Sequence, residues 1–447
     1  MINKMMIGWV SKENFMRSWA WVQKGGWAVL DQGIFAGSNF AINILLARWL
    51  DGKAYGSFSL AYSIFLLISS FHMAVVTDPL MIFGAGKYRF EQKHYWPLVI
   101  VIHFAVMGML SICMLICGYV FFSMNQLIFR IILALALSNP AILLLLVIRR
   151  IFFTLLRPEL AALSGAIYTL IVLLFFYFLK SIERITFANV FYLMGISSVI
   201  CSLVFLNKTG LKIKCFDSKL MNKLEYNSRD AVNELLGYLN MARDHWNYGK
   251  WAFGTSILIW LSGTQIYTVV APVNIGLEAV AGLRALLNLV FPILQGMTAI
   301  SSLSIPILSD AYKRNRLVFV RLIIVFASIF SIISILNFII LFFWGDYLLT
   351  FLYNNKYMDY KYLLPLIGFI PLVSSIGLLL SNALKSIEKP NLVLFGYFGA
   401  VIFTFVIGIP LGLSFGLVGL LVGLISTHLI LGIIFLSLLY HQVTISK

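Results

Sequence analysis

The chain is built largely from apolar stretches long enough to cross a membrane, divided by short polar segments. These runs are continuous rather than alternating, which favours helices over the strands of an outer-membrane barrel. Charged residues are 11% of the chain, too few to cover a soluble surface, which needs about 25%. We expect an all-α polytopic membrane protein with about twelve transmembrane helices, at residues 27–48, 58–80, 97–122, 127–148, 160–179, 186–206, 252–272, 283–308, 318–343, 362–382, 391–411 and 416–439.

Basic residues outnumber acidic ones, 33 against 17. In a soluble chain this balance would favour nucleic acid as a partner. Here the basic residues lie between the apolar runs, which is typical of positive-inside topology and of contact with anionic membrane lipids. Twelve spans put both termini on one side, and that side holds 25 of the 33 Lys and Arg residues. The sequence therefore predicts cytoplasmic termini and no nucleic-acid partner.

Two sets of matching features indicate an internal duplication. Trp27-Ala28 opens the first span and Trp251-Ala252 the seventh, and a basic segment ending in proline follows both the fourth span, at Pro158, and the tenth, at Pro390. Two six-helix halves of the same orientation would enclose a central cavity, where substrate binds in transporters of this design. The expected divisions are an amphipathic segment 1–24, a first half 25–206, a cytoplasmic linker with an amphipathic helix 207–250, a second half 251–440 and a tail 441–447.

Acidic residues inside the expected spans are candidates for a coupling-ion site. Asp31 lies in the first span, where Asn39 and Asn43 fall near the same helix face. This polar stripe either lines a cavity, with Asp31 binding a cation or proton, or packs against neighbouring helices. Asp78 precedes Pro79 and marks either a second cation site or a structural kink.

A second polar stripe lies in the other half of the chain. Arg284, Asn288 and Gln295 share a helix face, and Gln265 extends the set from the preceding span. A guanidinium suits a diphosphate because it offers a planar fork of donors. Arg48 occupies the comparable place in the first half. For both arginines the alternative is that the side chain reaches the outer lipid headgroups.

Two local motifs carry a resemblance to a known family. The segment from Ile44 to Gly56, an apolar run followed by Ala47-Arg48 and then Tyr55-Gly56, resembles the end of the first helix in polysaccharide flippases. Arg149-Arg150 followed by Arg157-Pro158 resembles the basic loop after their fourth helix. Together with its length, span number and duplication, the chain is similar to the multidrug/oligosaccharidyl-lipid/polysaccharide (MOP) exporter superfamily, nearest the O-antigen flippases of the Wzx type.

The resemblance implies a carrier that moves undecaprenyl-diphosphate-linked oligosaccharides to the outer leaflet of a bacterial inner membrane. The product would feed O-antigen, capsule or exopolysaccharide synthesis, with a polysaccharide polymerase and a chain-length regulator as partners. Transport would be coupled to Na⁺ or H⁺, with no cofactor.

Two other functions remain open from the sequence. One is a cation-coupled drug or small-molecule antiporter of the same superfamily, which would need an acidic cavity where a flippase needs a basic one. The other is a membrane polymerase or glycosyltransferase. An enzyme is disfavoured because the longest expected outer loop, 344–361, carries no paired acidic motif, and the sequence shows no nucleophile triad, phosphate-binding loop or metal cluster.

Overall fold

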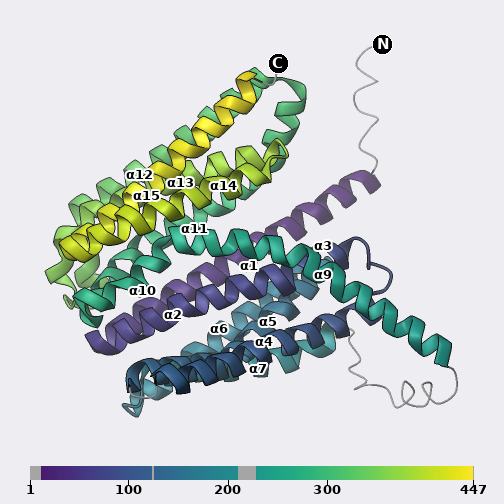
Figure 1. Ribbon diagram of the computed structural model, residues 1–447, viewed down its shortest axis with the longest axis horizontal. Helices are drawn as coiled ribbons and strands as arrows, with labels where there is room; N and C mark the ends of the chain where they lie inside the picture. Colours follow the sequence, from purple (N-terminus) through teal and green to yellow (C-terminus); the bar gives the residue numbers. More distant parts are fainter. Residues whose placement is uncertain (1–11, 123–124, 210–227, 446–447) are drawn as a thin grey trace.

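The computed structural model describes residues 12–122, 125–209 and 228–445, which form helices and no strand (Figure 1). Its first half consists of seven helices and two short turns of other helix types: α1 (Lys12–Trp49), α2 (Gly52–His72), η2 (Met73–Thr77), α3 (Asp78–Ala85), α4 (Gln92–Phe122), α5 (Gln126–Thr154), α6 (Pro158–Ser181), α7 (Phe187–Leu206) and η3 (Asn207–Thr209). Within this bundle α5 is central and packs against both α4 and α7.

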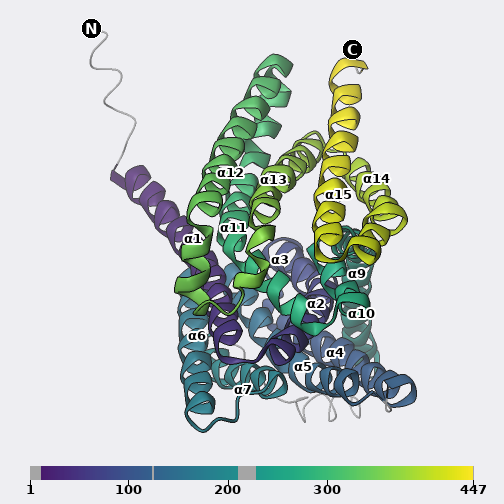
Figure 2. The same ribbon diagram turned by 90° about the vertical axis from the view of Figure 1, so that its left-hand side faces the viewer.

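The second half begins after the segment 210–227 and contains the remaining described elements: α9 (Ser228–Ser262), α10 (Thr264–Ile275), α11 (Leu277–Arg314), α12 (Arg316–Tyr353), η4 (Met358–Leu363), α13 (Leu364–Ser386), α14 (Pro390–Phe403), η5 (Thr404–Gly408) and α15 (Ile409–Ile445). Here α13 is central and packs against α11, α12 and α15. The two bundles meet where α1 and α2 pack against α11 (Figure 2).

Several helices begin at residues that suit the first turn of a helix. Asp51, Asn125, Thr186 and Asn315 each precede a helix and accept a hydrogen bond from a backbone N–H of its first turn. Such caps satisfy donors that have no partner inside the helix. Proline begins α6 and α14, a position where its missing N–H and fixed φ are harmless.

Ten described helical stretches are long and apolar enough to cross a membrane, and one bent pair adds an eleventh. That pair is 236–262 and 264–273, which bend by 53° at Gly263. The last of the ten stretches, 390–443, has 54 residues, far more than the 20 or so that one crossing needs. Dividing it in two gives the expected twelve spans.

The stretch divides at Gly416, whose φ of 62° and ψ of −142° only glycine adopts readily. Around this turn two helical segments pack backbone to backbone. A Cβ atom on Gly419 would lie 1.9 Å from the Leu411 carbonyl oxygen, and one on Gly423 would lie 2.5 Å from that of Gly408. The chain therefore reverses at Gly416, and the expectation of an all-helical membrane protein with about twelve spans is confirmed.

Three expected boundaries differ from the described helices. Residues 12–24 are not a separate surface helix, because α1 runs without a break from Lys12 to Trp49; residues 1–11 lie outside the described part. The amphipathic helix expected inside 207–250 is continuous with the seventh span in α9. The second span continues past Asp78-Pro79 to Ala85. The π-helical turn η2 lies directly before the proline, and its wider hydrogen-bond pattern lets the helix continue although Pro79 has no backbone N–H.

We call the end of the molecule where α1 begins and α15 finishes the terminus end, and the opposite end the closed end (Figure 1). The closed end contains the start of α2 and the start of α11 in direct contact. A Cβ atom on Gly56 would lie 2.0 Å from the Leu277 carbonyl oxygen. Only glycine permits this approach, so the two halves are tightly joined there.

The hairpin at Gly416 gives a stability prediction. Gly419→Ala should lower the free energy of unfolding by about 1–3 kcal/mol, because the new methyl group collides with backbone. Gly432→Ala on the same helix is the matched control, since nothing lies within 4 Å of its Cβ position and alanine favours a helix. Thermal unfolding of the purified variants measures both. Equal melting temperatures would contradict the backbone contact.

Candidate functional site

A group of polar side chains lies at the junction of the two halves, near the closed end. We call Arg284, Asn288, Asn43, Tyr55 and Tyr62 the central cluster. Arg284 Nε donates to Asn43 Oδ1 at 3.4 Å, and its guanidinium lies over the Tyr62 ring, 4.9 Å from the ring centroid. One turn further along α11, Asn288 Nδ2 donates to the Tyr55 hydroxyl at 3.0 Å. The cluster thus joins α1, α2 and α11.

The positive charge of the central cluster has no negative partner. Arg284 is only 5% exposed, and no aspartate or glutamate of the described residues forms an ion pair with it. One amide oxygen and one aromatic face compensate it instead. A charge in the hydrocarbon costs about 2.5–3.5 kcal/mol on insertion scales, so this arrangement leaves a strong preference for an anion.

The sequence predicted four members of this neighbourhood and missed two. Arg284, Asn288 and Asn43 belong to the cluster, and Asn39 adjoins it, because its Oδ1 accepts a hydrogen bond from the Tyr62 hydroxyl at 3.3 Å. Tyr55 and Tyr62 were not predicted. They are seven residues apart on one face of α2, a spacing that indicates helix core as readily as a site.

The other predicted substrate residues lie away from the central cluster. Arg48 is exposed at the closed end, where its Nη2 donates to Asn354 Oδ1 at 2.7 Å. Gln295 is half-buried on α11, and the eleven residues that separate it from Arg284 place it about 16 Å nearer the terminus end. Gln265 on α10 is half-buried, and its Oε1 has no hydrogen-bond partner. Substrate contact for these three side chains stays a prediction.

Both predicted coupling-ion residues face arginines. Asp31 Oδ1 accepts from Arg149 Nη2 at 2.6 Å, and the aspartate side chain is 1% exposed. Asp78 interacts electrostatically with Arg150, the next residue of α5. We call these four residues the charge cluster. The sequence assigned no site role to Arg149 and Arg150, although an Arg-Arg pair at the end of an apolar span was a visible signal. Cation binding at Asp31 and Asp78 stays a prediction.

At the closed end, the segment that follows α12 binds the last residues of α1. Lys356 Nζ donates to the carbonyl oxygens of Ala47, at 2.9 Å, and Leu50. The Tyr357 hydroxyl also donates to Ala47, at 3.0 Å. A cation at the last carbonyls of a helix complements its dipole. Burial lowers the pKa of Lys356, and the negative charge of Asp51 opposes that shift.

Toward the terminus end the two halves separate. Gly33 and Gly37 on α1 and Gly296 on α11 have nothing within 4 Å of their Cβ positions, and the Phe35 side chain is 47% exposed. The first part of α1 diverges from α11 and α12 in both views (Figures 1 and 2). The central cluster therefore lies where the two halves meet, and the first part of α1 leaves the second half on the side of the terminus end.

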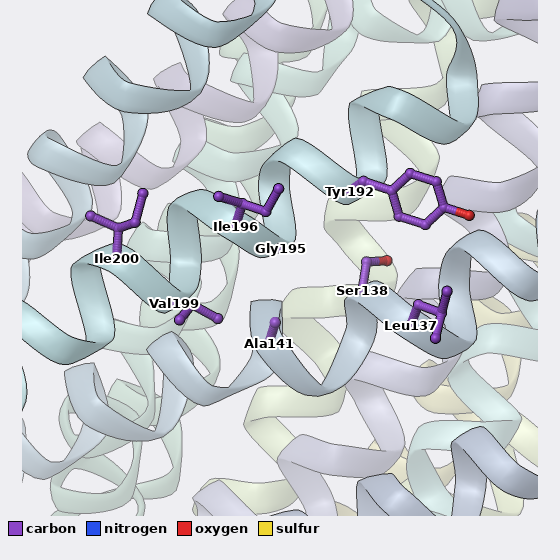
Figure 3. Close-up of a pocket in the computed structure, with 8 residues that line it drawn as sticks. All are labelled: Leu137, Ser138, Ala141, Tyr192, Gly195, Ile196, Val199 and Ile200. Atoms are coloured by element: carbon purple, nitrogen blue, oxygen red, sulfur yellow. The ribbon is translucent and has the colours of Figure 1, made fainter.

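Two hollows lie outside the central cluster. An apolar groove of about 450 Å³ lies between α5 and α7, lined by Gly195 and Ala141 together with aliphatic side chains (Figure 3). A hollow of about 200 Å³ inside the second half is lined mainly by apolar side chains, together with several hydroxyl groups and His428. No group of three or more metal-ligating side chains occurs among the described residues.

Solved structures match this chain along nearly its whole length. An inward-facing multidrug resistance MATE family transporter of the MOP superfamily is 14% identical, with a TM-score of 0.68, over 94% of this chain and 98% of that one. The chain has the fold of MATE family transporters. An outward-facing structure of such a transporter is 13% identical with a TM-score of 0.64, over 96% of both chains.

A MOP superfamily transporter from Pyrococcus furiosus matches equally well, at 13% identity and a TM-score of 0.64 over 96% of both chains. That protein is described as having a binding pocket of reverse polarity, which suggests a different function. No protein-family model and no curated protein matches this chain. At such low identity the structural matches establish the fold alone.

The contact between Arg284 and Tyr62 can be measured directly. Tyr62→Leu should lower the free energy of unfolding by about 2 kcal/mol, because it removes a desolvated cation–π contact. Tyr62→Phe keeps the ring and loses only the hydroxyl bonded to Asn39, so it should cost about 0.6 kcal/mol. Equilibrium unfolding in bicelles measures the free energy of unfolding of both variants and of the wild type. Equal losses would show that the ring does not stabilise the guanidinium.

Proposed function

We propose that this chain is a transporter that moves a phosphate-bearing lipid-linked substrate through the membrane by alternating access. The observation that carries this proposal is Arg284, a buried guanidinium at the junction of the two halves that has no acidic partner among the described residues. A substrate phosphate supplies the missing negative charge. The planar fork of donors can bind two phosphate oxygens at once.

The neighbours of Arg284 fit the rest of such a substrate. The amides of Asn43 and Asn288 and the hydroxyl groups of Tyr55 and Tyr62 provide donors and acceptors where the halves meet, as a sugar next to a diphosphate requires. The polyprenyl tail would stay in the lipid while the polar head passes between the halves. The resemblance of the Ala47–Gly56 and Arg149–Pro158 segments to polysaccharide flippases supports undecaprenyl-diphosphate-linked oligosaccharides as the substrate, in a bacterial inner membrane.

The expected topology is consistent with this substrate. The excess of Lys and Arg on the side of the termini predicts that the terminus end faces the cytoplasm. Lipid-linked oligosaccharides would then enter from the cytoplasmic leaflet. In the opposite state, the contacts of Lys356 and Tyr357 with α1 would have to break at the closed end.

A cation-coupled drug antiporter is the second candidate. It is favoured by the structural matches, two of which are multidrug resistance transporters. A pocket for cationic drugs needs free acidic groups, whereas here Asp31 is paired with Arg149 and Asp78 faces Arg150. The reverse-polarity pocket of the Pyrococcus furiosus protein supports the view that this fold accommodates substrates of either sign. The charge of the central cluster therefore favours an anion here.

The proposal predicts the effect of removing the guanidinium. Arg284→Ala should abolish export of lipid-linked oligosaccharide, because truncating a buried charged contact costs about 2–5 kcal/mol of binding, at least 30-fold. Arg284→Lys should retain part of the export, since the lysine ammonium keeps the positive charge but cannot bind two phosphate oxygens as the planar guanidinium does. Flipping of the lipid-linked substrate in proteoliposomes measures the effect.

The matched control is Arg314→Ala, at the far end of the same helix, where the side chain is 78% exposed. It should leave transport unchanged. Normal transport by Arg284→Ala would contradict the proposal. If variants of Asp31 and Asp78 lost efflux of a cationic dye while Arg284→Ala kept it, the result would support the antiporter instead.

Orientation can be tested independently. A cysteine at Asp359, exposed at the closed end, should react with a membrane-impermeant maleimide added outside intact cells. A cysteine at Lys389, exposed after α13, should react only after the cells are opened. The natural cysteines would first be replaced by serine. The reverse labelling pattern would overturn the predicted cytoplasmic location of the termini.

A further inference from the structure

The hollow inside the second half lies where a long helix bends. At Gly263 the helix α9 gives way to α10 at an angle of 53°, and residues of α11, α13, α14 and α15 complete the walls. We call this space of about 200 Å³ the His428 hollow and define it by the polar residues on which its chemistry depends, which are Ser262, Ser374, Ser375, Tyr397 and His428.

The His428 hollow adjoins the junction between the two halves. Ile259, which lines the hollow, is 43% exposed. The next residue, Trp260, donates from Nε1 to the Ser63 carbonyl oxygen of α2 at 3.1 Å. Leu294 of α11 also lines the hollow, and it lies ten residues beyond Arg284, about 15 Å nearer the terminus end. A head group whose diphosphate contacts Arg284 can therefore place one of its later sugars at the hollow.

The lining of the hollow suits a ligand without charge. The described residues that line it include no aspartate, glutamate, lysine or arginine. The central cluster and the charge cluster differ in this respect, because both contain arginine. A phosphate or a cationic drug would lose its hydration in the hollow without meeting an opposite charge, which is unfavourable. The ligand that fits is polar and neutral.

Three serines give the hollow an excess of hydrogen-bond acceptors. The hydroxyl of Ser262 donates to the Leu258 carbonyl oxygen at 2.8 Å, and that of Ser374 donates to Ile370 at 2.8 Å. Ser375 donates to a carbonyl of its own helix in the same way. Since a hydroxyl has one hydrogen and two lone pairs, each of these oxygens can still accept but has no hydrogen left to donate. A ligand with several O–H groups is the complement.

His428 supplies a donor and an acceptor that the protein does not use. Its side chain is half-buried on α15 and makes no hydrogen bond with any of the described residues. A neutral imidazole has one N–H donor and one acceptor nitrogen. Leaving both without a partner inside a membrane protein is unfavourable, and the hydroxyl groups of a sugar can satisfy both.

The size and the apolar part of the wall fit a single sugar ring. A space of about 200 Å³ is smaller than the usual pocket for a drug-sized ligand, about 300–1,000 Å³, so it accommodates one ring rather than a whole head group. Leucine side chains and the Tyr397 ring form much of the remaining wall. The C–H faces of a pyranose pack on such surfaces while its hydroxyl groups reach the polar atoms.

We propose that the His428 hollow binds one uncharged sugar ring of the transported oligosaccharide, with His428 and the serine oxygens as its hydrogen-bond partners. This inference rests on the proposed function, and it divides recognition between Arg284 for the diphosphate and the second half for the sugar. Gln265 and Gln295, which the sequence indicates as substrate residues, are close along the chain to Gly263 and Leu294 of the lining.

The test measures the affinity of three ligands for the full-length protein by titration calorimetry in micelles free of phospholipid. The first is the undecaprenyl-diphosphate-linked oligosaccharide extracted from the bacterium that encodes this chain. The second is the free oligosaccharide released from that lipid by mild acid, and the third is undecaprenyl diphosphate, which has the same tail and no sugar. The lipid-linked oligosaccharide should bind about 5-fold more tightly than undecaprenyl diphosphate, because it adds hydrogen bonds in the hollow.

Variants assign the difference to the hollow. His428→Leu should weaken binding of the lipid-linked oligosaccharide about 5-fold and Ser375→Ala about 2-fold, because each removes hydrogen-bond partners of the sugar. Both should bind undecaprenyl diphosphate as the wild type does, which also shows that they are folded. Ser328→Ala is the matched control, since this serine likewise donates to a carbonyl of its own helix but is exposed on α12 outside the lining. It should leave the affinities for all three ligands unchanged.

The outcomes separate this inference from the proposed function. Equal wild-type affinities for the two lipids, with no effect of His428→Leu or Ser375→Ala, would overturn the inference and leave the proposed function intact. No binding of any of the three ligands would overturn both. Binding of the free oligosaccharide that depends on His428, without binding of undecaprenyl diphosphate, would support the sugar site and overturn the diphosphate contact of Arg284.

Discussion

The guanidinium of Arg284 is the feature on which the central architecture depends. It lies inside a membrane protein with an aromatic face and an amide oxygen as its partners, and without a carboxylate among the described residues. Tyr62 and Asn43 come from the first half and Arg284 from the second. The same contact therefore joins the two halves and places a positive charge where they meet.

The first helix contacts two buried arginines, and it offers each of them a different kind of partner. Near the closed end, the partners of Arg284 are the neutral amide of Asn43 and the Tyr62 ring, with no carboxylate among the described residues, which suits an anion. Nearer the terminus end, Asp31 neutralises Arg149. The closed end is held by hydrogen bonds from Lys356 and Tyr357 to the last carbonyls of α1.

The sequence predicts the all-helical spans because apolar length alone specifies a membrane helix. It also predicts Arg284, Asn288 and Asn43, because a polar residue in hydrocarbon is conspicuous. It does not predict Tyr62 or Tyr55 as their partners, since an aromatic residue inside a span is ordinary. The ion pair of Asp31 with Arg149 joins residues 118 positions apart, and no local pattern specifies which acid meets which arginine.

The central claim is that the binding pocket of this chain is built for an anion. The most direct test is a cryo-electron microscopy structure of the protein in a nanodisc with an added polyprenyl diphosphate. The account predicts density for the diphosphate within hydrogen-bonding distance of the Arg284 guanidinium, between the two halves. A diphosphate bound elsewhere, with Arg284 still in contact with Tyr62 and Asn43 alone, would contradict it.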